Sequence, residues 1–344
     1  MAADIPTGAN DEDVDTAGSS LRQKDGISAT PARYAAGRIL HRMTGVLPPR
    51  AVEWVRTSVP GATTVRVQER FAGATSSSLH AIEVDRTDGP PLPLVLRRYT
   101  DARVRTEEPQ YPRTEATALH ALDGAPGVLA PRLVAVDERG TTCDVPAVLM
   151  TRLPGRPTLS PSDVGAWVRG LAEALTAVHR VDGAAVEGSY RRWHDPQTAV
   201  APLWSRQPEA WTRLIDASRS REPSGHIVLL HRDFHPANVL WLNGRVSGVV
   251  DWPNACHGVA ALDVGHCRRD IVMTHGVAVA EAFLTAYGEA SKRAPDALCD
   301  ALTLLDISQV TNVTPYHAYG RTDLTVESTR ARLDEYAALV AGRL

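Results

Sequence analysis

One segment in the second half of the chain contains the residue types needed for phosphoryl transfer. It reads His231-Arg232-Asp233-Phe234-His235-Pro236-Ala237-Asn238. Transfer to a hydroxyl needs a carboxylate that orients the attacking oxygen and accepts its proton, with an oxygen ligand for Mg²⁺ close behind it. Asp233 and Asn238, five residues apart, supply these two groups.

Asp251 is the candidate for a second metal-binding carboxylate. A metal that bridges nucleotide phosphates needs such a group, because Mg²⁺ prefers hard oxygen ligands and usually keeps several waters. Between Asn238 and Asp251, an Asn243-Gly244 pair separates two apolar runs, which predicts a β-hairpin. Because a hairpin folds back on itself, we expect it to return Asp251 to the neighbourhood of Asn238.

Short alternating runs before residue 150 predict a mostly β lobe. Strands are expected at 64–68, 79–84, 92–99, 133–136 and 147–150, with a turn at 88–91 before the third strand. Pro112 and Thr114 open a helix between the third and fourth strands. Helical spacing from Pro31 and a second helix over 49–59 precede the sheet. Residues 31–150 are therefore predicted to form an antiparallel β lobe with preceding helices.

The chain after residue 150 is mostly helical in pattern. An apolar stripe predicts a core helix with Val168, Leu171, Ala172, Leu175 and Val178 on one face. We expect His179 to cap or pack, and the segment 300–320 to be helical and core-forming. Residues 151–344 are predicted to be a helical lobe with the catalytic loop and acceptor site. Residues 1–30 lack apolar periodicity, which predicts a disordered tail.

Net charge and cysteine spacing limit the kinds of molecule that the protein is expected to bind. A formal net charge of −3 gives no large positive field, so neither nucleic acid nor a membrane is expected as a partner. The four cysteines show no metal-binding or disulfide spacing, and the N-terminus lacks a secretory signal. No apolar run is long enough to span a membrane. We expect a cytoplasmic protein that binds a nucleotide and a small hydroxylated substrate; the oligomeric state stays open.

The loop and the hairpin together resemble the aminoglycoside phosphotransferase family, whose fold is similar to that of protein kinases. His, Arg, Asp, Pro and Asn stand in register, and the hairpin ends in Val-Val-Asp-Trp. The resemblance extends from roughly residue 60 to 340 and is strongest over 226–265. It implies an α+β, protein-kinase-like fold with a small antiparallel β lobe and a larger helical lobe. It also implies Mg²⁺-dependent transfer of the γ-phosphate of ATP or GTP to a hydroxyl.

The same resemblance assigns roles to individual residues. It implies that Asp233 is the catalytic base and that Asn238 and Asp251 are Mg²⁺ ligands. His231 would hold the loop by hydrogen bonds. Asp263 looks like the family's later aspartate, which buttresses the loop.

A kinase-like nucleotide site needs a cation on the third strand, paired with a helix glutamate. No lysine occurs between Lys24 and Lys292, so an arginine must serve. The family pattern Val-Leu-Arg points to Arg97, with Glu115 as its partner. Strand alternation puts Arg97 and Arg98 on opposite faces, so only one can face the phosphates. The alternative is that both are solvated surface arginines.

Two further segments would contact the nucleotide. The loop at 73–78 has a single glycine, but it lies between two strands at the right distance to cover the phosphates. The segment 150–155 lies where the family's interlobe hinge falls, so its backbone would meet the adenine. The candidate residues are Gly73, Ser76, Ser77, Met150 and Arg152.

The identity of the acceptor stays open. Residues 251–344 contain twelve Asp and Glu against eight Lys and Arg, an excess that permits a polycationic aminoglycoside without demanding one. A macrolide, another hydroxylated antibiotic, or a metabolite such as a sugar, choline or homoserine fits almost as well.

Two other classes of protein compete with a small-molecule kinase. Arg232 stands where protein kinases have Arg and many members of the family have Gly. However, Asp251-Trp252-Pro253 replaces Asp-Phe-Gly, and no Ala-Pro-Glu follows, which disfavours protein substrates. A nucleotide-binding scaffold without catalysis is the other alternative, because the lysine is missing and the phosphate loop is poor in glycine.

Overall fold

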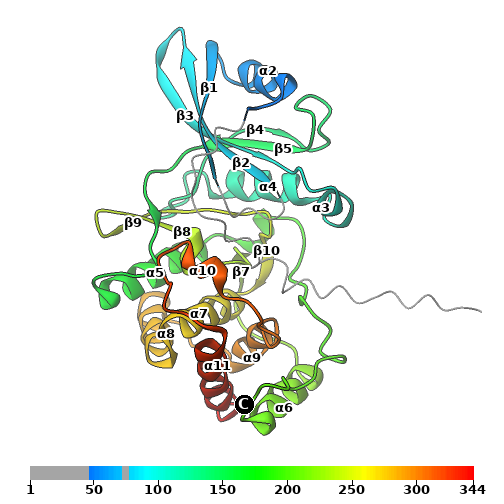
Figure 1. The fold of residues 1–344 in the computed structure, drawn as a ribbon, viewed down its shortest axis with the longest axis vertical. Helices are drawn as coiled ribbons and strands as arrows, with labels where there is room; N and C mark the ends of the chain where they lie inside the picture. Colours follow the sequence, from blue (N-terminus) through cyan, green and yellow to red (C-terminus); the bar gives the residue numbers. More distant parts are fainter. Residues whose placement is uncertain (1–45, 72–76) are drawn as a thin grey trace, which may run out of the picture.

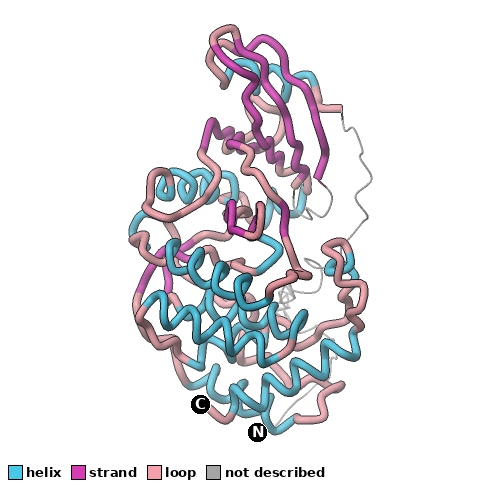
Figure 2. The backbone as a smooth tube through the Cα atoms, turned by 90° about the vertical axis from the view of Figure 1, so that its left-hand side faces the viewer, coloured by secondary structure: helices cyan, strands magenta, loops and turns pink. Residues whose placement is uncertain are grey.

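The computed structural model describes residues 46–71 and 77–344. The predicted tail, the helix expected from Pro31, and Gly73 and Ser76 lie outside these residues. One lobe of the molecule is built on a sheet of long strands and the other is mainly helical, as the two views in Figures 1 and 2 show. The predicted α+β, two-lobed architecture is therefore confirmed.

The N-terminal lobe is built on a five-stranded antiparallel sheet in the order β1-β2-β3-β5-β4. Its strands are β1 (Ala62–Phe71), β2 (Ser78–Arg86), β3 (Gly89–Arg98), β4 (Leu133–Asp137) and β5 (Ala147–Thr151). Each predicted strand is present. β3 begins earlier than predicted because Gly89 already pairs with Arg86 across a two-residue turn.

Three helices accompany this sheet: α2 (Pro49–Ser58), α3 (Ala102–Glu107) and α4 (Tyr111–Leu122). The predicted helix over 49–59 corresponds to α2. Its Trp54 and Val55 are buried in one cluster with Leu94 and Leu96 of β3. The apolar side of α4 contributes Leu119 to the main core of the molecule, which continues into the helical lobe. The sheet thus packs against α2 in its own lobe, and α4 connects this lobe to the main core of the molecule.

The C-terminal lobe is mainly helical. Its helices are α5 (Val164–Val178), α6 (Pro208–Ser220), α7 (Ala261–His275), α8 (Val277–Ser291), α9 (Ala297–Leu305), α10 (Thr314–His317) and α11 (Val326–Ala341), with 3₁₀ turns η1 (Gly183–Ala185) and η2 (Pro236–Asn238). Its short strands are β6 (Arg156–Pro157), β7 (Ile227–Leu230), β8 (Val239–Leu242), β9 (Arg245–Val249) and β10 (Cys256–Val259).

Helix α5 matches the predicted core helix. The side chain of Asp163 accepts from the backbone N–H of Ala166 at 2.8 Å, so it caps the first turn. All five apolar residues of the predicted stripe are buried. His179 is the C-terminal capping residue and is buried, as predicted.

The segment 300–320 is not one helix, which corrects the sequence prediction. Helix α9 ends at Leu305, and α10 begins only at Thr314. Asp306 turns its carboxylate to His194 at 2.7 Å, and the side chain of Asn312 accepts from the N–H of Thr314 at 2.9 Å. Between the two helices the backbone makes turn hydrogen bonds, such as that from the N–H of Val310 to the oxygen of Ile307 at 3.0 Å. The apolar residues of this segment are nevertheless buried, as predicted.

The predicted hairpin is formed by β8 and β9. Asn243 and Gly244 have φ of 53° and 75°, the left-handed values that a tight two-residue hairpin turn requires. Val239 pairs with Val249 at the open end of the hairpin. The register therefore brings the residues before β8 next to those after β9.

The structure bears on two sequence predictions, those for membrane-spanning segments and for disulfide bonds. Across the residues that the structure describes, no helix is both long and apolar enough to cross a membrane. All four cysteines are buried and free of disulfide bonds.

Candidate active site

The loop that carries Asp233 is held from beneath by Asp263 of α7. This carboxylate accepts from the backbone N–H groups of His231 and Arg232, each at 2.7 Å. His179 Nε2 lies 3.2 Å from the same carboxylate and Nδ1 lies 2.8 Å from the hydroxyl of Tyr287. Asp263 thus holds the backbone of the loop by two hydrogen bonds, and His179 contacts the same carboxylate.

His231 connects the loop to the end of the hairpin. Its Nε2 lies 2.9 Å from the carbonyl oxygen of Val250, and its Nδ1 accepts from the N–H of Asp233 at 3.3 Å. These partners assign the proton to Nε2. Burial lowers the pKa of His231, so the ring stays neutral. The ring also packs on Trp252, with centroids 4.3 Å apart.

The hairpin brings Asn238 and Asp251 together. The N–H of Val250 donates to the backbone oxygen of Asn238 at 2.9 Å, which closes the hairpin one residue before Asp251. The side-chain Nδ2 of Asn238 donates to the carbonyl oxygen of Asp233 at 3.0 Å, so Oδ1 is the amide atom left for a metal. Asp251 has φ of 75°, a strained backbone value of the kind found at functional sites.

Arg97 of β3 contacts its predicted partner Glu115 and also Asp251, the candidate metal ligand. Its Nε lies 3.1 Å from Oε2 of Glu115, and its Nη1 lies 2.7 Å from Oδ1 of Asp251. The hydroxyl of Tyr99 donates to the same Glu115 oxygen at 3.0 Å. Burial would lower the pKa of Arg97, but the carboxylates of Glu115 and Asp251 raise it above its ordinary value. The guanidinium therefore remains charged.

Arg98 lies on the opposite face of β3, as strand alternation predicts. It pairs with Asp144 at 2.5 Å, away from Arg97 and its partners. Both arginines are buried, so the alternative of two solvated surface arginines is wrong. Of the two, Arg97 is the one that contacts Glu115 and Asp251.

The remaining predicted nucleotide contacts lie along the sheet side of the site. Ser77 is buried, and its Oγ has no hydrogen-bond partner within the described residues. Met150 is buried in β5. The backbone N–H of Arg152 donates to the oxygen of Pro93 at 3.1 Å, and its guanidinium lies over the ring of Phe71. Because that N–H is used within the sheet, an adenine would have to meet another backbone group of this segment.

Two histidines lie next to the carboxylate of Asp233, and the sequence prediction assigned a role to neither. Oδ1 of Asp233 lies 3.2 Å from Nε2 of His266 and 3.9 Å from Nε2 of His235. Burial would raise the pKa of Asp233, but the hydrogen bond with His266 and the charge of His235 hold it well below its usual range. His266 follows Asp263 by three residues on α7, a spacing that places both on one face. This spacing is the feature of the sequence from which a role for His266 beside Asp263 could have been predicted.

The donor atoms of this site fit Mg²⁺. A carboxylate of Asp251 and an amide oxygen of Asn238 are hard ligands, and Mg²⁺ bound to nucleotide phosphates takes only one or two carboxylates from the protein. No group of three His, Cys, Asp or Glu side chains suited to a metal occurs in the ranges 46–71 and 77–344. Asn238 and Asp251 would hold Mg²⁺ together with the nucleotide phosphates and water.

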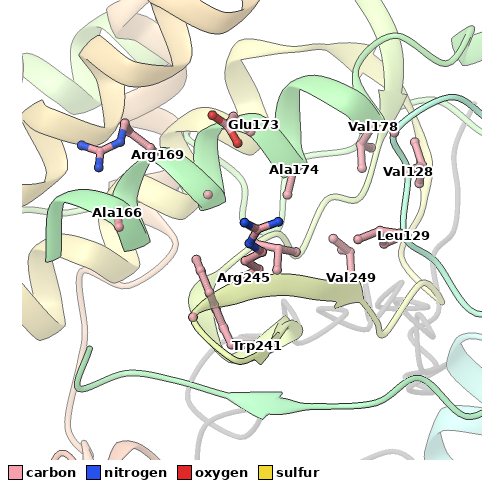
Figure 3. A pocket seen from close by; sticks show the side chains of 14 residues that line it. Val128, Leu129, Ala166, Arg169, Glu173, Ala174, Val178, Trp241, Arg245 and Val249 are labelled. Atoms are coloured by element: carbon pink, nitrogen blue, oxygen red, sulfur yellow. The ribbon is translucent and has the colours of Figure 1, made fainter. Parts of the chain in front are cut away.

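A separate pocket of about 440 Å³ lies between α5 and the β8–β9 hairpin (Figure 3). Its walls include Ala166 and Ala174 of α5 and Trp241 and Val249 of the hairpin. The catalytic, metal and nucleotide residues predicted from the sequence are absent from its lining. This pocket is therefore distinct from the candidate active site.

Comparison with known proteins decides the family. The model of the phosphotransferase enzyme family matches residues 69–336. The chain belongs to this family. The predicted family is confirmed, and this phosphotransferase is similar to curated homoserine kinases. The protein from Bradyrhizobium sp. is 29% identical over 202 residues, which cover 49% of this chain and 60% of that protein. The protein from Chelativorans sp. is 32% identical over 133 residues, which cover 36% and 40%.

Solved structures agree with the fold of this phosphotransferase. Macrolide 2′-phosphotransferase from Brachybacterium faecium is 19% identical, with a TM-score of 0.52 over 85% of this chain and 98% of that one. An aminoglycoside phosphotransferase in ternary complex with ADP and hygromycin B is 15% identical, with a TM-score of 0.53 and the same coverage. At these identities the likeness is one of fold, and it confirms the predicted protein-kinase-like architecture.

Proposed function

We propose that this phosphotransferase moves the γ-phosphate of ATP or GTP to a hydroxyl of a small molecule, with Mg²⁺ held by Asn238 and Asp251. The main support for this proposal is the contact between Arg97 and Asp251. Arg97 lies on the sheet, and Asp251 lies at the end of the hairpin that starts next to Asn238. A phosphate-binding cation and a metal ligand from different lobes thus lie at one place. Asp233 on the same loop as Asn238 favours catalysis over a scaffold that only binds nucleotide.

Each residue of the site has a definite task in this reaction. Asp233 has a pKa well below its usual range, so it is ionised and accepts a hydrogen bond from the acceptor hydroxyl. Arg97 contacts the phosphates, and Glu115 fixes its position. When bound, Mg²⁺ would neutralise charge on the phosphates. Asp263 and His231 hold the loop so that Asp233 keeps its place.

The charges of the helical lobe favour an acceptor that is not a polycation. Most carboxylates after residue 251 already pair with other groups of the protein, which leaves few for a multiply charged ligand. The paired residues are Asp263, Asp270, Glu281, Asp300, Asp306, Asp323 and Asp334. The curated relatives are named homoserine kinases. Homoserine, a small amino acid with one primary hydroxyl, is therefore the first acceptor to test.

An acceptor screen tests this proposal. Purified protein would be incubated with Mg-ATP or Mg-GTP and with homoserine, choline, aminoglycosides or macrolides, and phosphorylated products would be identified by mass spectrometry. We expect phosphohomoserine from the wild type and a loss of at least about 10³-fold in Asp233→Asn. Phosphorylation of an aminoglycoside or macrolide instead would correct the acceptor. Absence of any product across the panel would overturn the proposal.

A further inference from the structure

His266 lies at the centre of a buried polar network beneath Asp233. Its Nε2 lies 3.2 Å from Oδ1 of Asp233, 2.8 Å from Nη2 of Arg269 and 3.8 Å from Oδ2 of Asp270. The hydroxyl of Tyr316 donates to the other oxygen of Asp270 at 2.9 Å. His266, Arg269 and Asp270 all lie on α7, and all three are buried.

One ring nitrogen cannot satisfy Asp233 and Arg269 at the same time. A neutral imidazole nitrogen either carries a proton and donates, or presents a lone pair and accepts. If Nε2 of His266 accepts from Arg269, its lone pair faces the negative Oδ1 of Asp233. If it carries the proton, it donates to Asp233, and Arg269 must be held by its other partners.

The other contacts of these residues favour the second arrangement. The guanidinium of Arg269 already lies 2.6 Å and 3.1 Å from Oδ2 of Asp270, through Nη2 and Nε. By contrast, His235 is 3.9 Å from Oδ1 of Asp233, beyond hydrogen-bond distance. A lone pair on Nε2 would face the negative charge of Oδ1, whereas Arg269 keeps its contacts with Asp270 when it gives up this one bond. The proton therefore belongs on Nε2.

We propose that His266 is a positioning residue for the catalytic aspartate. Its Nε2–H fixes Oδ1 of Asp233, and this leaves Oδ2 to receive the acceptor hydroxyl; Oδ2 makes no hydrogen bond within the part of the chain that the structure describes. Arg269 and Tyr316 hold Asp270 beneath the ring and so keep His266 in place. The inference rests on the proposed function, in which Asp233 acts on that hydroxyl.

Paired variants of His266 test this role by kinetics. In His266→Gln the amide nitrogen replaces Nε2 as a donor, whereas His266→Leu keeps the volume and removes the donor. We expect the Leu variant to lower kcat about 10- to 100-fold with the KM for Mg-ATP unchanged, and the Gln variant to restore kcat to within a few-fold. In the Asp233→Asn background the Leu substitution should cause no further loss, because its effect acts through that carboxylate.

A control variant separates positioning from general stability. His275→Leu changes a histidine on the same helix that contacts Trp167 and Arg321 instead of Asp233. It should lower the Tm without the selective loss of kcat. The proposal is overturned if the Gln variant is as impaired as the Leu variant, or if the loss persists in full without Asp233.

A spectroscopic measurement tests the contact without any turnover. In ¹⁵N-histidine NMR spectra of the full chain, we expect the proton of His266 on Nε2 in the wild type. In Asp233→Ala we expect it on Nδ1, because Nε2 is then free to accept from Arg269. An unprotonated Nε2 in the wild type would overturn the proposal. Lack of turnover in the acceptor screen would refute the proposed function instead, since the spectra do not depend on it.

Discussion

Nη1 of Arg97 lies 2.7 Å from Oδ1 of Asp251, and this contact joins the sheet of one lobe to the hairpin end of the other. The same guanidinium lies against Glu115, which is fully buried. The residue proposed to contact the phosphates and a residue proposed to bind the metal are thus placed together by the fold itself. A nucleotide with its metal would therefore bind where Arg97 and Asp251 already lie side by side.

Removal of Arg97 should damage both stability and nucleotide binding. Arg97→Ala leaves Glu115 buried without its cation, which should lower the free energy of unfolding by about 3–5 kcal/mol. The KM for Mg-ATP should rise at least about tenfold. Denaturant unfolding and steady-state kinetics check these values.

Arg97→Lys is the conservative comparison. It keeps the charge but cannot bridge Glu115 and Asp251 with separate nitrogens as a guanidinium does, so it should fall between the wild type and the Ala variant. Wild-type stability and KM in Arg97→Ala would show that the pair has no such role.

Asp251→Asn should weaken the response to Mg²⁺. The amide is a poorer ligand than the carboxylate for a hard divalent cation, so the Mg²⁺ concentration that gives half-maximal rate should rise at least about tenfold. Asp323→Asn is the matched control, because Asp323 pairs with Arg321 and is exposed. An unchanged Mg²⁺ response in Asp251→Asn, or an equal change in the control, would contradict the assignment.

Arg232 tests how backbone strain is tolerated in the loop. Its φ of 66° lies in the left-handed region that favours glycine, and its guanidinium packs over the ring of Trp193 at 3.9 Å. Both Arg232→Gly and Arg232→Ala lose the packing, but only the glycine relieves the backbone. We expect the Gly variant to be about 1 kcal/mol more stable than the Ala variant in denaturant unfolding. Equal stability of the two would mean that the strain is negligible.

The stability of the protein should fall as the pH drops below about 6.5. Burial, together with the charges of Arg98 and Arg70, lowers the pKa of His80 to about 4. An unfolded chain binds a proton at this histidine near pH 6.5, while the folded chain does not until about pH 4. Acid therefore favours the unfolded state between these values, and the full stability is present above them.

Urea unfolding of the wild type and His80→Gln at pH 7.5, 6 and 5 measures this dependence. The variant should lose less stability than the wild type over this range, because it lacks the titrating group. Parallel losses in the two proteins would assign the pH dependence to other groups.

The parts of the site that are contiguous in sequence could be predicted in detail. The loop before Asn238 and the hairpin to Asp251 carry their own turn signals, and local geometry alone returns one to the other. The family pattern pointed to Arg97, while strand alternation required only that one of Arg97 and Arg98 face the site and left open which one. These inferences needed no knowledge of how the lobes pack.

His266 could not be found in the same way. Nearly all residues of α7 are buried, so the helix shows no apolar stripe against which a functional polar residue would stand out. The spacing of three residues between Asp263 and His266 indicates a shared face, and the packing of α7 under the loop shows which atoms the two side chains contact. The break between α9 and α10 was also missed, because the apolar residues of 300–320 continue past the end of α9 at Leu305.

The most direct test of the account is a single-turnover measurement of γ-phosphate transfer from labelled ATP to homoserine by the wild type and by Asp233→Asn. Both proteins would be saturated with Mg-ATP, whose Kd is measured separately. We expect label to appear in the acceptor with the wild type, and the variant to bind Mg-ATP with similar affinity but to transfer at least about 10³-fold more slowly. Transfer at a comparable rate by Asp233→Asn would contradict this expectation.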